Sequence, residues 1–137
     1  MVVDDDSDTV VVLSRHLQRE GFVPISAYSG NECLKLLHKD DVDVILLDLM
    51  MPSMDGFQVL KELKNNPRTA EIPVIMLTAR DDIDARAEGM RLGISDFISK
   101  PVFRGQLALR IRAQLEAVQN ARDTMAAIRR FENIKPE

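Results

Sequence analysis

Five side chains that could take part in phosphoryl chemistry stand where apolar stretches of the sequence end: Asp4, Asp5, Asp48, Thr78 and Lys100. A buried carboxylate is costly unless a cation lies beside it, and clustered carboxylates repel each other. Magnesium suits such a group because it is a hard cation that takes oxygen ligands. With a lysine and a hydroxyl added, the set suits formation of an acyl phosphate on one carboxylate.

Each residue also has an ordinary structural interpretation. Asp6 or Ser7 can cap a helix, Thr78 can be a strand-end hydroxyl, and Lys100 can be a solvated surface lysine. Complementary groups at several strand ends are less easily explained by chance. The combination therefore favours a functional site.

The elements that position these residues follow from hydrophobic spacing. After Val2-Val3, which resembles the end of a strand truncated at its start, apolar runs occupy 23–27, 42–47, 72–77 and 97–99. Segments with helical spacing follow Asp6/Ser7, Ser29-Gly30, Asp55-Gly56 and Asp81/Asp82, and a last one begins near Arg104. Alternating strands and helices predict a parallel sheet covered on both faces, with ligands at the carboxyl ends of the strands.

The bulk composition indicates one globular domain. The chain has 137 residues, 45% of them hydrophobic and 29% charged, with a net charge of −4. This balance argues against direct binding of nucleic acid. No apolar stretch reaches the roughly 18 residues of a membrane span, and the start lacks a basic export region. We expect a cytoplasmic protein without membrane association, with its single cysteine, Cys33, in the core.

The spacing of the polar residues resembles the receiver domain of bacterial two-component response regulators over about residues 1–116. The resemblance rests on Val3-Asp4-Asp5, Asp48-x-x-x-Pro52-x-x-Asp55-Gly56, Thr78-Ala79 and Lys100-Pro101. It implies an α/β, flavodoxin-like, doubly wound sheet of five parallel strands in the order 2-1-3-4-5, with five helices.

The resemblance also implies a role for each site residue. Asp48 would accept a phosphoryl group from the phosphohistidine of a sensor histidine kinase or phosphotransfer protein. Asp5, Asp48 and the backbone carbonyl of Met50 would bind magnesium, with Asp4 acting largely through a water. Lys100 would pair with the phosphoryl oxygens.

Further roles concern switching and hydrolysis. The Lys100–Pro101 peptide bond is expected to be cis, and Thr78 and Phe97 would move together on phosphorylation, although Phe97 is also a plausible core residue. Met50 and Arg80 occupy positions that tune hydrolysis. Met50 cannot orient a water, so we expect a long-lived phosphoryl group.

The last helix should continue beyond the receiver domain. Apolar or small residues recur every three or four positions, without Gly or Pro until Pro136: Leu107, Ile111, Leu115, Val118, Ala121, Met125 and Ile128. This spacing predicts a helix of about 25 residues, which could fold back or form a parallel coiled-coil dimer. We expect residues 117–137 to lead to an output domain, with dimerisation through this helix and the face of the fourth helix, fifth strand and fifth helix.

Three other functions are alternatives to a phosphorylation switch. A phosphorelay carrier remains an alternative. An aspartate-nucleophile phosphatase usually carries a second acid two residues after the nucleophile, where Met50 stands. A receiver-like module that is never phosphorylated would be expected to have lost a site residue, and none has been lost.

Overall fold

Strands and helices alternate along the chain in a computed structural model that describes residues 1–79 and 82–133. The strands are β1 Val2–Val3, β2 Ser26–Ala27, β3 Ile45–Asp48, β4 Val74–Thr78 and β5 Asp96–Ser99. The helices are α1 Ser7–Arg19, α2 Gly30–Leu37, α3 Gly56–Asn65, α4 Ile83–Leu92 and α5 Arg104–Glu132.

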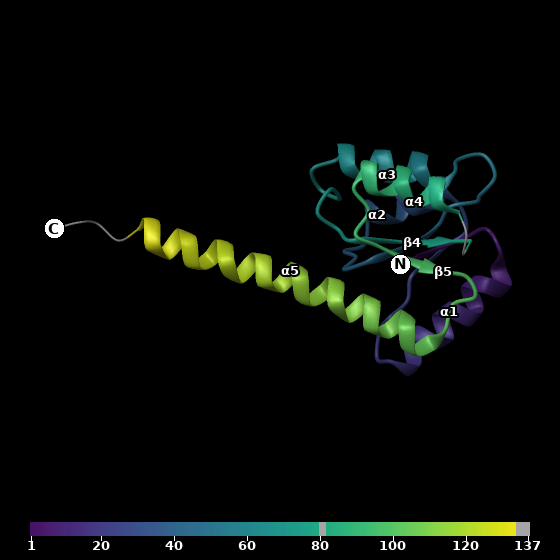
Figure 1. The fold of residues 1–137 in the computed structure, drawn as a ribbon, viewed down its shortest axis with the longest axis horizontal. Helices are drawn as coiled ribbons and strands as arrows, with labels where there is room; N and C mark the ends of the chain where they lie inside the picture. The colour runs from purple at the N-terminus through teal and green to yellow at the C-terminus, as the bar shows by residue number, and fades with distance from the viewer. Residues whose placement is uncertain (80–81, 134–137) are drawn as a thin grey trace.

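The five strands form one parallel sheet in the order β2-β1-β3-β4-β5. Helices α2, α3 and α4 lie on one face of this sheet, and α1 and α5 lie on the other (Figure 1). Alternate strand residues contribute to two cores, with Leu47 and Met76 in the first and Leu46 and Ile75 in the second. The predicted α/β fold class and strand order are confirmed.

The outer strand β2 is shorter than the apolar run that predicted it. Residues 23–25 precede the strand, and Val23 is 88% exposed. The neighbouring β1 begins at Val2, which pairs with Ser26 and donates its N–H to the Ile25 carbonyl, so Val23 and Pro24 lie before the paired residues. Pro24 also lacks a backbone N–H with which to extend the ladder.

Local capping groups fix the helix starts. The side chains of Asp6, Ser29, Asp55 and Asp82 each accept a hydrogen bond from a backbone N–H in the first turn of α1, α2, α3 and α4, respectively. Helix α4 ends at Leu92 and is followed by the capping residue Gly93, whose φ of 93° lies in the left-handed region that favours glycine. Asp81, the other residue considered for the start of α4, lies outside the described residues.

Helix α5 runs for 29 residues and leaves the domain after its first turns (Figure 1). Its buried residues are Leu107, Ala108 and Ile111. Leu115 is half-buried, and residues 121–133 are exposed. Among the described residues, none of the helices is long and apolar enough to cross a membrane. Cys33 is buried within the core, and this burial raises the pKa of its thiol to about 12.

Candidate functional site

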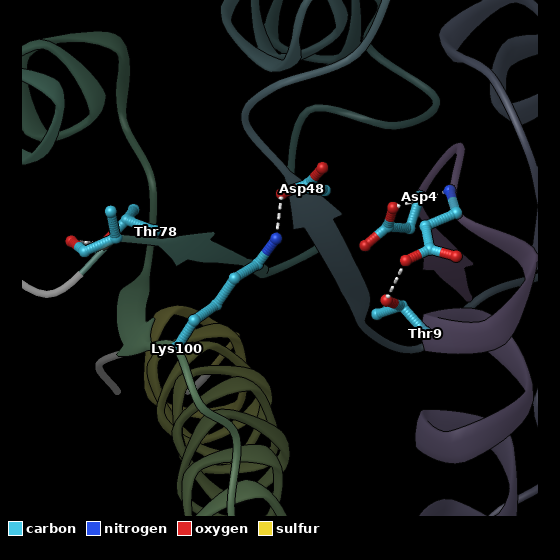
Figure 2. Close-up of polar contacts among 7 residues, drawn as sticks. Asp4, Thr9, Asp48, Thr78 and Lys100 are labelled. Carbon is cyan, nitrogen blue, oxygen red and sulfur yellow. Dashed lines mark hydrogen bonds and ion pairs between the residues drawn. The ribbon is translucent and has the colours of Figure 1, made fainter.

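The polar residues predicted at the strand ends lie along the carboxyl edge of the sheet. Asp48 and Thr78 are the last residues of β3 and β4, Lys100 directly follows β5, and Asp4 and Asp5 directly follow β1. Since all strands are parallel, these residues reach the same edge from four strands (Figure 2).

An ion pair joins Asp48 to Lys100. The Lys100 Nζ donates to Asp48 Oδ1 at 2.8 Å (Figure 2). The Asp48 side chain is 5% exposed, whereas the Lys100 side chain is 43% exposed. The lysine therefore supplies the cation that the buried carboxylate needs, while remaining accessible from solvent.

Three carboxylates form a group that could hold a metal ion. Asp4, Asp5 and Asp48 each offer one oxygen, and these oxygens lie within 4.8 Å of one another. Asp4 is buried. Its Oδ1 accepts from the backbone N–H of Asp6 at 2.9 Å, but its Oδ2 has no hydrogen-bond partner among the described residues.

The electrostatics of this group favour an added cation. Burial raises the pKa of Asp4, with smaller contributions from the neighbouring carboxylates of Asp48 and Asp5. Lys100 provides one positive charge beside three acidic groups. A hard divalent cation with oxygen ligands fits the unpartnered Asp4 oxygen and the excess negative charge.

Thr78 does not direct its hydroxyl at Asp48 in this conformation. The residue is buried, and its Oγ1 donates to the backbone carbonyl of Ala79 at 3.1 Å (Figure 2). The structure thus brings Asp4, Asp5, Asp48 and Lys100 together, while the hydroxyl of Thr78 is engaged locally.

The loop between β3 and α3 approaches the site closely through Gly56. The Gly56 N–H donates to the Leu49 carbonyl at 3.0 Å. A Cβ added at Gly56 would lie 2.8 Å from both the backbone oxygen of Asp48 and Leu49 Cα, which leaves no room for a larger residue. Met50, in the same loop, is 77% exposed.

The aromatic residue on β5 has a partner that the sequence analysis did not identify. The Arg86 guanidinium on α4 lies 5.7 Å from the centroid of the half-buried Phe97 ring and donates to the Ser99 hydroxyl. Arg86 is one of several charged residues in α4, so its position in the sequence did not indicate a contact with Phe97. Ser99 could be placed opposite Thr78 only once the strand register was known.

Two further predictions concern the peptide bond before Pro101 and the residue at position 80. The Lys100–Pro101 peptide bond is cis. Arg80, the second position predicted to tune hydrolysis, lies outside the described residues.

Comparisons with known proteins agree on one family. The family model described as the response regulator receiver domain matches residues 1–112. A putative response regulator from Chloroflexus aurantiacus is 33% identical, with a TM-score of 0.79, and the match covers 84% of this chain and 95% of that chain.

Two other similar structures are a receiver domain of a histidine kinase and a longer response regulator chain. The receiver domain of a Syntrophus aciditrophicus signal transduction histidine kinase is 31% identical, with a TM-score of 0.79 and coverage of 85% of this chain and 89% of that chain. NtrX from Brucella abortus is 27% identical, with a TM-score of 0.84, and the match covers 90% of this chain and 28% of that chain.

Proposed function

Because the chain belongs to the response regulator receiver domain family of two-component signalling, we propose that it is a switch operated by phosphorylation of Asp48. The observation that carries this proposal is the placement of Asp48, which is buried at a strand end, paired with Lys100 and grouped with two further carboxylates. The donor is the phosphohistidine of a sensor histidine kinase or of a phosphotransfer protein.

The proposed transfer uses the two oxygens of Asp48 differently. Lys100 donates to Oδ1, and the other oxygen attacks phosphorus as the P–N bond of the phosphohistidine breaks. Lys100 then donates to an oxygen of the transferred group. Asp5, Asp48 and the Met50 carbonyl, with Asp4 through a water, would hold magnesium, which would neutralise charge on the phosphoryl oxygens.

The switching step follows from the present position of Thr78. Its hydroxyl would exchange the Ala79 carbonyl for a phosphoryl oxygen, and Phe97 would turn toward the space that Thr78 leaves. Arg86 contacts both Phe97 and Ser99, so α4 would move with β5.

The surface of α4, β5 and α5 is the proposed readout. It exposes Ile83, Met90 and Leu109. We propose that an output domain joined through residues 117–137, or a second copy of the receiver, reads this surface. The match to a fraction of the longer NtrX chain supports such an attachment.

A phosphorelay carrier is the second candidate. One of the similar structures is a receiver domain of a histidine kinase. A carrier would return the phosphoryl group to a histidine of another protein. Incubating the phosphorylated chain with histidine phosphotransfer proteins would distinguish the two roles, since a terminal switch retains its label.

The experiment that tests the switch is phosphorylation by a small phosphodonor. With acetyl phosphate and Mg²⁺, intact-protein mass spectrometry should detect one added phosphoryl group on the native chain and none on Asp48→Asn. Asp5→Asn should lose the Mg²⁺ dependence. Asp41→Asn, an exposed position at the opposite edge of the sheet, is the matched control and should behave as the native chain. Labelling of Asp48→Asn would refute the assignment.

A further inference from the structure

One arginine of α4 contacts two side chains of the edge strand β5. The Arg86 guanidinium lies over the Phe97 ring, 5.7 Å from its centroid, and donates a hydrogen bond to the Ser99 hydroxyl. All three residues are half-buried. Phe97 and Ser99 are two positions apart in β5, so both face the side of the sheet that α4 covers (Figure 1). A single side chain thus joins the helix to two neighbouring groups of the strand.

The strand register places this contact beside the threonine proposed to move on phosphorylation. Parallel pairing sets Phe97 opposite Met76 and Ser99 opposite Thr78. Thr78 and Phe97 are therefore diagonal neighbours on the face that α4 covers. Because Arg86 reaches the ring from the helix, whereas Thr78 belongs to the sheet, a turn of the ring toward Thr78 separates it from the guanidinium.

The two contacts of Arg86 respond differently to such a turn. A cation over the face of an aromatic ring stabilises the ring position in which the two are in contact. The hydrogen bond to Ser99 does not depend on the rotamer of Phe97, and it keeps the guanidinium where the ring meets it. An arginine that only packed α4 against the sheet would stabilise both positions of the ring equally. The cation over the ring favours one of them.

We propose that Arg86 is a positioning residue that holds Phe97 in the position of the unphosphorylated chain and opposes its turn toward Thr78. This inference rests on the proposed function, in which that turn accompanies phosphorylation of Asp48. The phosphoryl group then has to supply the free energy that separates the ring from the guanidinium. Arg86 therefore sets the fraction of phosphorylated chains that switch.

Fluorine NMR of the chain labelled with 4-fluorophenylalanine measures this balance. The chain contains five phenylalanines, and Phe97→Leu identifies the Phe97 resonance by its loss. Beryllofluoride with Mg²⁺ mimics a phosphoryl group on a carboxylate, and the Phe97 resonance reports the conversion as beryllofluoride is added. The quantity compared between variants is the beryllofluoride concentration at half-conversion.

Loss of the cation should make the conversion easier. In Arg86→Met the concentration at half-conversion should fall roughly three- to tenfold, as expected for loss of a half-buried cation–π contact. Arg86→Gln keeps a donor for Ser99 without the charge and should fall similarly. Arg86→Lys keeps the cation and should stay closer to the native value. Arg91→Met is the matched control, because Arg91 lies on the same helix but pairs with Glu88, and it should match the native chain.

The outcomes that overturn the proposal are distinct from failure of the switch itself. An unchanged or raised concentration in both Arg86→Met and Arg86→Gln would show that Arg86 does not oppose the turn. A fall in Arg86→Lys as large as that in Arg86→Met would show that the charge does not hold the ring. Absence of any beryllofluoride response in the native chain would overturn the inference together with the assignment of Asp48.

Discussion

Asp48 is held in a site whose charges are not balanced by the protein alone. Three carboxylates share the cation of Lys100, and one oxygen of Asp4 is unpartnered among the described residues. Burial raises the pKa of Asp4, so its contribution to stability is present at low pH and is lost as the pH rises through the raised pKa. The residues thus favour a bound cation over an empty site.

We expect the lifetime of the phosphoryl group to depend on the side chain at position 50. Met50 is exposed beside the proposed phosphoacceptor and has no group that can orient a water. Met50→Asn supplies a donor and an acceptor, and we expect it to shorten the lifetime by roughly tenfold. This is less than the roughly hundredfold or more that a general acid or base contributes, because an amide can orient a water but cannot take its proton. The measurement is loss of label from phosphorylated protein in Mg²⁺ buffer.

The matched control for this change is Met50→Leu, which keeps an apolar side chain and should keep the lifetime. If native protein loses its label within seconds, or if both variants accelerate equally, access of water is not controlled by this side chain.

At the level of elements, signals within the sequence predicted the order of helices and strands. Asp55 and Gly93 act through neighbouring backbone groups, so their roles could be predicted without the fold. The start of β2 depends on where β1 begins, which no local pattern contains. The contact of Arg86 with Phe97 and the orientation of the Thr78 hydroxyl depend on packing between elements, and these were not predicted.

The start of α3 links helix stability to the geometry of the site. Asp55 accepts from the Gln58 N–H, while the Gln58 side chain accepts from the Asp55 N–H, each at 2.9 Å. Asp55→Ala removes the cap and should lower the free energy of unfolding by about 1 kcal/mol. Asp55→Ser keeps an oxygen at the cap and should lower it by less. Urea unfolding provides the comparison, and equal losses in both variants would contradict a capping role.

For the whole molecule, we expect the stability of the fold to be independent of the projecting part of α5. The buried residues of α5 all precede residue 112, and residues 121–133 are exposed. A chain ending at Glu116 should therefore keep its free energy of unfolding within about 0.5 kcal/mol, as expected for changes at exposed positions. Urea unfolding at protein concentrations that favour monomers provides the measurement.

A chain ending at Ala108 is the contrasting variant. It loses the buried side chain of Ile111 along with the following turns, and it should be destabilised by more than about 2 kcal/mol. If removal of residues 117–137 alone lowers the free energy of unfolding by as much, those residues belong to the folded domain rather than to an extension.

The length of α5 also has a mechanical consequence. The helix is held by the sheet only along its first turns, and the remaining length from Leu115 to Glu132 is roughly 26 Å at 1.5 Å per residue. A tilt of about 5° at the held end would displace the far end by roughly 2 Å over that length. Such a lever would turn a sub-ångström change beside Lys100 into a shift comparable to those that repack subunit interfaces.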